Sequence, residues 1–261
     1  MFKRTIIAIF LIAVLLTQVT AVSALTASDA KQDWRDAKTV SAQKQEIHRD
    51  AKITFAGDAS EENKQAVVDT GKDVLNAALD EAEAWLLWKD LETEENPDIP
   101  DDLKETIHED VETNLAKIDE LRSDVDGISN RLELGIVYLK MVGSYIELVT
   151  DVARDSGMVY VHLANTHIEK AEDLESRLRE SAEGIDDNEE IIEKLDAARD
   201  DLDEARSNVD KAESSYKQVM LPGTPLIKFS EGNNYLRVAR TNLLSAHRNL
   251  NQAYILMVRG E

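Results

Sequence analysis

The sequence predicts an all-α protein: an elongated antiparallel helical bundle, or bundles, with coiled-coil-like packing and about six long helices after a signal peptide. Three observations carry this prediction. Aromatic residues make up only 5% of the 261 residues, and the apolar residues, 43% of the chain, recur at helical spacing. The four prolines all stand between the periodic segments, where they can end helices without interrupting them.

Residues 1–24 have the layout of a secretory signal peptide. Lys3 and Arg4 supply a positive start, residues 6–16 form an apolar run, and small residues precede an expected cleavage site after Ala24. An uncleaved anchor is the alternative, but this run is short of the ~20 residues that a membrane span needs. We therefore expect a secreted or cell-surface (extracytoplasmic) product with no membrane span after signal cleavage.

The first two helices of the mature chain have readable ends. A helix is predicted over about 28–55, and Gly57 can end it. Asp58 and Glu61 then have the spacing of a capping box, in which the aspartate accepts from free backbone N–H groups of the next helix. That second helix is predicted to run to about Glu94.

Two prolines separate the second helix from the third. Pro97 and Pro100 remove backbone donors and fix φ, which stops a helix. A third helix is predicted over about 101–125, and a fourth is expected to start near Ser129.

The fourth helix is predicted to be about twice as long as the others and to continue to Glu183. Between residues 132 and 152 it is apolar almost all round, which is typical of a helix surrounded on most sides. We therefore expect it to pass from an N-terminal helical bundle, residues 25–157, into a C-terminal three-helix bundle, residues 158–261, with or without a bend at Gly157.

The last two helices carry the most specific pattern in the chain. In both, one large and one small position recur every seven residues, as in a coiled-coil seam. The large positions are Leu195, Leu202, Val209 and Tyr216, then Phe229, Leu236, Leu243, Leu250 and Met257; the small ones are Ala198, Ala205 and Ala212, then Gly232, Ala239, Ala246 and Ala253.

A short turn at residues 221–225 predicts that these two helices form an antiparallel hairpin. In the register that the turn favours, Ala205 faces Leu243 and Tyr216 faces Gly232. Large side chains then oppose small ones along most of the seam, which allows dense packing at close approach.

Charge and cysteine content exclude several classes of partner and site. Lys and Arg number 30 against 52 Asp and Glu, for a net charge of −22, which disfavours phosphate backbones and predicts no nucleic-acid partner. The absence of cysteine excludes disulfides, thiolate metal sites and lipoprotein acylation.

The histidines do not predict a metal centre or a catalytic site. Glu105 and His108 form one Glu-x-x-His motif, but a carboxylate-bridged di-iron bundle needs two. His162 and His167 are five residues apart, which is the wrong spacing for a metal pair on one helix face, and we interpret both as partly buried structural residues. A Gly-rich phosphate loop and a nucleophile elbow are also absent from the sequence. We expect no enzyme and no cofactor.

Four aromatic residues are the candidate ligand or partner surface: Trp85, Trp88, Tyr138 and Tyr145. Core packing is the simpler interpretation of such side chains. A pocket lined by them would indicate a binding module, whereas exposed apolar stripes on the first two helices would indicate a protein partner.

The sequence thus favours a secreted acidic helical-bundle protein that acts as a non-enzymatic interaction or scaffold module, with a protein partner or self-association at the cell exterior. The alternative is an extracytoplasmic binding module for a small apolar or cationic ligand held in the N-terminal bundle.

Overall fold

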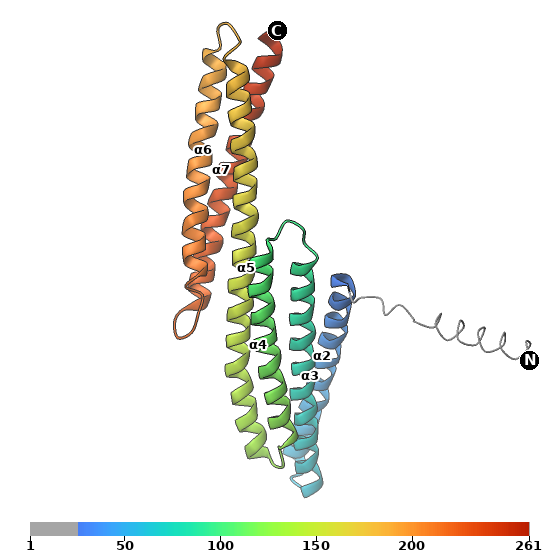
Figure 1. Cartoon of the computed structure of the whole chain (residues 1–261). Helices are drawn as coiled ribbons and strands as arrows, with labels where there is room; N and C mark the ends of the chain where they lie inside the picture. Colours follow the sequence, from blue (N-terminus) through green and yellow to red (C-terminus); the bar gives the residue numbers. More distant parts are fainter. Residues whose placement is uncertain (1–25, 261) are drawn as a thin grey trace, which may run out of the picture.

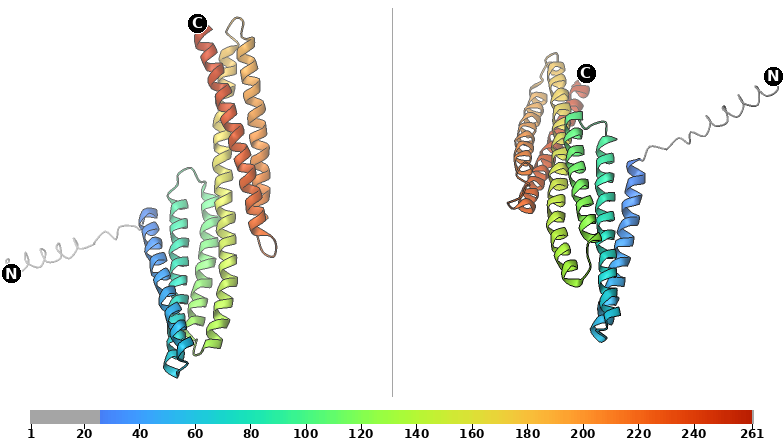
Figure 2. Two further views of the ribbon diagram at one scale, coloured as in Figure 1. Left: turned by 180° about the vertical axis from the view of Figure 1, so that it is seen from behind. Right: turned by 60° about the horizontal axis from the view of Figure 1, so that its bottom comes forward.

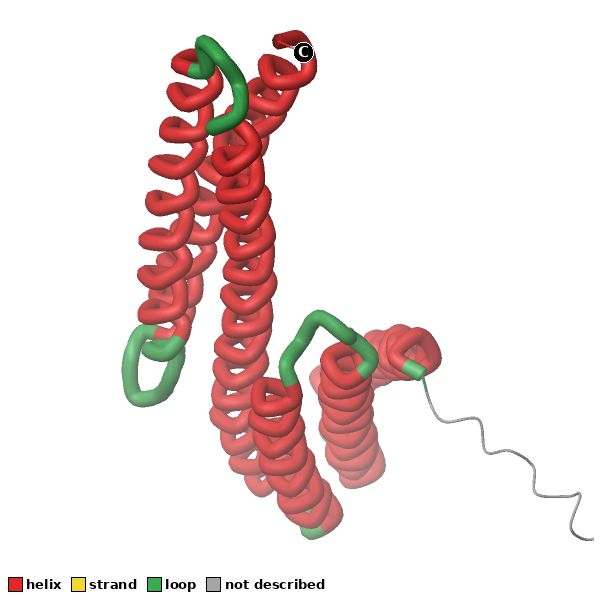
Figure 3. Tube along the Cα trace, turned by 45° about the horizontal axis from the view of Figure 1, so that its top comes forward, coloured by secondary structure: helices red, strands yellow, loops and turns green. Residues whose placement is uncertain are grey.

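The computed structural model describes residues 26–260, and this part of the chain is all-helical, with no strand. The predicted fold class is therefore confirmed. Six helices follow one another through short connections (Figures 1 and 3): α2 (Ala27–Gly57), α3 (Glu61–Glu94), α4 (Asp101–Asp126), α5 (Arg131–Ala182), α6 (Glu189–Tyr216) and α7 (Pro225–Gly260). The expected signal peptide, residues 1–24, lies outside the described residues.

The cap of α3 differs from the prediction. Ser60, not Asp58, is the N-cap, and its hydroxyl accepts from the backbone N–H of Asn63 at 3.3 Å. Asp58 instead accepts from the N–H of Ser60. Ser60 directly precedes the first helical residue, so its side chain reaches a free N–H group that the aspartate, two residues earlier, is not placed to cap.

The start of α6 has no side-chain cap. Asn188 is the N-cap but makes no side-chain capping bond, and Asp187 adopts a left-handed conformation with φ 56°. The Asn188 side-chain amide instead donates to the carbonyl of Ala182 at 2.8 Å. The same carbonyl also accepts from the backbone N–H of Ile185 at 3.1 Å, so the asparagine adds a second bond at the end of the preceding helix.

Helix α5 connects the two halves of the molecule. It is one continuous helix of 52 residues, ~78 Å long at 1.5 Å per residue, with no break at Gly157. Its first half packs against α4 and α3, and its second half packs against α6 and α7 on the opposite side (Figures 1 and 2). The backbone of α2 runs close to that of α3 and of no other described helix.

The hairpin of α6 and α7 has the predicted register. The seam alanines, among them Ala205 and Ala246, are fully buried, and Ala205 shares a core cluster with Leu243. The ring of Tyr216 lies so close to Gly232 that a Cβ atom there would be 2.6 Å from Tyr216 Cε1. Large and small side chains therefore alternate across the seam as expected.

The expectation that the first half of α5 is surrounded on most sides is wrong. Leu132 and Leu139 are 75% and 70% exposed, and several neighbouring apolar side chains are also exposed. Because α2 packs along α3, only α3 and α4 cover this half of α5, and both lie on one side of it. Helical periodicity showed an apolar face but carried no information on which helix would cover it.

Candidate ligand groove

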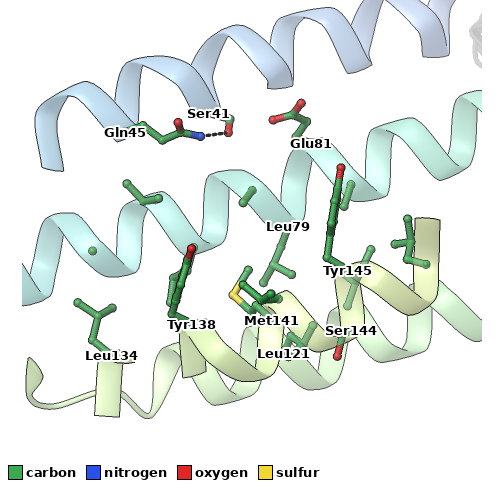
Figure 4. A pocket seen from close by; sticks show the side chains of 18 of the residues that line it. Ser41, Gln45, Leu79, Glu81, Leu121, Leu134, Tyr138, Met141, Ser144 and Tyr145 are labelled. Carbon is green, nitrogen blue, oxygen red and sulfur yellow. Dashed lines mark hydrogen bonds between the residues drawn. The ribbon is translucent and has the colours of Figure 1, made fainter. Parts of the chain in front are cut away.

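A groove of about 1150 Å³ lies between α2 and α5, over α3 (Figure 4). It exists because α2 and α5 flank α3 without meeting along their lengths. Its floor is apolar and comes from three helices: Leu75, Leu79 and Ala82 of α3, Ile118 and Leu121 of α4, and Leu134, Met141 and Leu148 of α5.

Three of the four aromatic candidates line this groove. Tyr138 and Tyr145 project from α5 toward α2 (Figure 4) and are 55% and 57% exposed. Trp85 of α3 is the third. Their presence here agrees with a pocket more than with core packing, since both tyrosines leave much of their surface uncovered.

The fourth candidate, Trp88, is not a lining residue. It is buried and stacks on Trp34 of α2, with ring centroids 5.0 Å apart and an interplanar angle of 25°. Trp34 itself lines the groove, a role that the sequence analysis missed. Its spacing of seven residues from Ser41 and fourteen from His48, both groove residues of α2, is the signal that could have found it.

The charge of the lining is opposite to that of the whole chain. The lining contains one carboxylate side chain, Glu81. It also contains three lysines, one arginine and one histidine: Lys38, Lys52, Lys117, Arg131 and His48. The chain as a whole has 52 acidic against 30 basic residues, so this reversal marks the groove off from the rest of the surface.

The basic side chains lie at both ends of the groove. At one end, the Arg131 guanidinium sits over the ring of Phe55 at 4.5 Å, one helical turn from Lys52. At the other end, Lys38 lies 5.1 Å from the Trp34 ring centre, and Lys117 pairs with Glu147 at 3.2 Å. Among the described residues, Lys38, Lys52 and Arg131 have no carboxylate within ion-pair distance.

His48 adds an uncharged hydrogen-bonding group to the groove. Burial lowers the pKa of the imidazole, and the charge of Lys52 lowers it further. The Nδ1 atom is 3.0 Å from the hydroxyl of Thr70, which orients the ring between α2 and α3. The ring is therefore predominantly neutral near pH 7.

Asn114 places an unsatisfied acceptor in the wall of the groove. Its side chain is buried, and Nδ2 donates to the carbonyl of Asp110 at 2.8 Å and to Asp151 Oδ2 at 3.1 Å. The amide oxygen Oδ1 has no hydrogen-bond partner among the described residues. Leaving such a buried acceptor unpaired costs ~1–3 kcal/mol of folding free energy.

The histidines considered for a metal site have other surroundings. His108 bonds Asp90 Oδ2 through Nδ1 at 2.9 Å, and that bond together with the carboxylate charge raises its pKa. His162 contacts the carbonyl of Asp98 at 2.7 Å. His167 is exposed, so its interpretation as partly buried is wrong.

The part of the chain that the structure describes shows no set of three or more histidine, aspartate or glutamate side chains arranged to hold a metal ion. Of the described helices, none has an apolar stretch long enough to cross a membrane. No protein-family model matches the chain, and no curated protein and no solved structure matches it either.

Proposed function

We propose that this protein is a non-catalytic binding module whose groove takes a long-chain anionic amphiphile. The observation that carries the proposal is the apolar groove with basic ends in a chain of net charge −22. It departs from the small apolar or cationic ligand that the sequence analysis considered, because the basic side chains of the groove favour an anion.

The dimensions of the groove fit an extended apolar chain. From Arg131 to Leu148 the lining follows α5 for ~26 Å at 1.5 Å per residue. Its volume of about 1150 Å³ is slightly above the ~300–1,000 Å³ typical of small-molecule sites. Burying a hydrocarbon tail on the floor gains roughly 25 cal/mol per Å² of apolar surface removed from water.

The basic ends supply the polar contacts. Lys52 and Arg131 line the same end of the groove, near Phe55, and have no carboxylate partner among the described residues, so both can bind one anionic headgroup. Charge-assisted hydrogen bonds of this kind are about twice as strong as neutral ones. A cationic amphiphile would meet repulsion at the same place, so the groove favours an anion over the cation that the sequence analysis considered.

The place of action is proposed from residues 1–24 alone. Their signal-peptide layout supports export, so we propose that the ligand is met outside the cytoplasm. A scaffold role at the cell exterior is the second candidate function, and the exposed apolar side chains of α2, Val40, Ile47 and Ile53, favour it.

Tryptophan fluorescence offers a direct test, because the chain has three tryptophans and all lie at or behind the groove. We expect a bromine-substituted stearate to quench this fluorescence and oleate to compete with it. Cetyltrimethylammonium, a cationic amphiphile, should compete far less. Absence of quenching, or equal competition by the cation, would contradict the proposal.

Two variants locate the binding in the groove. Lys52→Gln should weaken oleate binding about tenfold, the loss of one good charge-assisted contact. The matched control is Lys64→Gln, because Lys64 is exposed on α3 and pairs with Glu61 outside the groove. Equal affinities of the two variants would place binding elsewhere.

A further inference from the structure

One face of the first half of α5 is apolar and exposed, in a chain that has 52 acidic against 30 basic residues. This outer face consists of Leu132, Gly135, Ile136, Leu139, Val142, Gly143 and Ile146. Its five large side chains are all exposed. Gly135, Val142 and Ile146 also border the groove, so the outer face continues from the groove mouth around the helix.

The same side of α5 is covered further along. Leu139 and Gly157 are about five helical turns apart and therefore point in the same direction. At Gly157 this side receives the ring of Tyr216, and the hairpin of α6 and α7 covers it from there to the end of the helix. Below the α6–α7 turn, Figures 1 and 2 show no helix packed on the side of α5 away from α3 and α4.

This half of α5 has four carboxylates, of which Asp155 is buried and the other three have partners away from the outer face. Glu133 bonds the backbone and hydroxyl of Ser129, Glu147 pairs with Lys117 of α4, and Asp151 accepts from Asn114 of α4. In a chain with 52 acidic residues, a charge-free face of this length is where two copies could approach with the least repulsion.

The two glycines of the outer face, Gly135 and Gly143, are not required by any close neighbour among the described residues. A Cβ atom added at Gly135 or Gly143 would meet nothing within 4 Å. A glycine inside a helix costs ~1 kcal/mol relative to alanine, so neither the fold nor local packing accounts for them. Close approach of another backbone does account for glycine at such positions.

The residue types of the outer face are arranged symmetrically about Leu139. Val142 and Ile136 lie three residues away on either side, and Gly143 and Gly135 lie four residues away. In an antiparallel pair with its two-fold axis at Leu139, Gly143 therefore faces Ile136 of the second copy, and Val142 faces Gly135 of the second copy. Large side chains oppose small ones, as they do between α6 and α7.

We propose that the outer face of α5 binds a second copy of this chain in an antiparallel, two-fold symmetric dimer centred on Leu139. A two-fold interface needs a self-complementary patch, and this pattern is one. The helices that cover the other side of α5, α3 and α4, lie away from the interface. In such a dimer, α5 of each copy would lie below the α6–α7 turn of the other copy.

Cysteine cross-linking tests both the dimer and its direction, because the chain has no cysteine of its own. A disulfide requires Cα atoms within about 7 Å of each other. Leu139→Cys should therefore form a covalent dimer on mild oxidation, whereas Leu132→Cys should not, although Leu132 is more exposed. A mixture of Leu132→Cys and Ile146→Cys should form a mixed dimer.

Sedimentation of the unmodified chain and of one charge variant completes the test. We expect a concentration-dependent dimer that Leu139→Lys converts to monomer, because two ammonium groups would meet at the axis. Val40→Lys is the matched control on α2 and should stay dimeric. A monomeric wild type, cross-linking of Leu132→Cys as strong as that of Leu139→Cys, or equal dissociation by both lysine variants would each overturn the proposal.

Discussion

The ring of Tyr216 packs directly on the backbone of Gly157, so that a Cβ atom at position 157 would lie 2.3 Å from Tyr216 Cδ1. The tyrosine is fully buried, and its hydroxyl donates to Asn233 Oδ1 at 2.9 Å. Gly232 of α7 touches the same ring. One aromatic side chain of α6 thus packs against glycines of α5 and α7, at the level where α5 passes from one set of neighbours to the other.

Gly157→Ala should lower the free energy of unfolding by ~1–3 kcal/mol, even though alanine is the better helix former. The reason is that the added methyl group overlaps the buried ring, which the neighbouring helices hold in place. Urea unfolding measures the change. In a Tyr216→Leu background the same substitution should cost much less, and an equal cost in both backgrounds would show that the ring is not the obstacle.

Ala205→Leu should destabilise the hairpin by ~1–3 kcal/mol, because two large side chains would then occupy the space of one. Adding Leu243→Ala should recover much of the loss if the two residues face each other. A double-mutant cycle, measured by urea unfolding, gives the coupling between them. Purely additive effects would contradict the register, although they would leave the hairpin itself possible.

Asp155 should make stability fall as pH rises from about 4 to about 7. Burial raises the pKa of this carboxyl to about 7; the charge of Arg154 opposes the rise, and those of Asp110 and Asp151 add to it. The unfolded carboxyl loses its proton near 3.8, so between these values the folded state holds the proton more tightly. Ionising Asp155 therefore costs folding free energy above about pH 7.

Asp155→Asn should consequently raise the free energy of unfolding at pH 8 by up to ~4 kcal/mol and change it little below about pH 4. Urea unfolding across this pH range measures the difference. The control is Asp173→Asn, an exposed residue one turn from Arg177, which should show no comparable gain at pH 8. A variant of Asp155 that is less stable than the wild type at pH 8 would contradict the expectation.

The exported form should begin at Leu25, because the expected cleavage site follows Ala24. N-terminal sequencing of native material from outside the cell measures this directly. Recovery of the chain with Met1 intact in a membrane fraction would instead support the uncleaved anchor.

Local pattern was sufficient to predict where the helices lie and how the last two pair. The two prolines before Asp101 end α3 wherever the rest of the chain goes, and the seven-residue alternation of Leu202, Ala205 and their partners admits one short-turn register. Both conclusions rest on residues that are close in sequence or joined by a short turn. Periodicity and chain connectivity therefore determine them without reference to any other helix.

The tertiary structure alone decided which faces are covered. An apolar stripe shows that a face gains free energy on burial, but it does not name the helix, ligand or second chain that buries it. The periodicity of Leu139 fits a bundle core. The residue is exposed because α2 packs along α3 and does not cover α5. In the same way Lys52 and Arg131 are far apart in sequence and line the same end of the groove only because α2 and α5 pack around α3. The groove and its charge are products of that packing, which no single helical segment encodes.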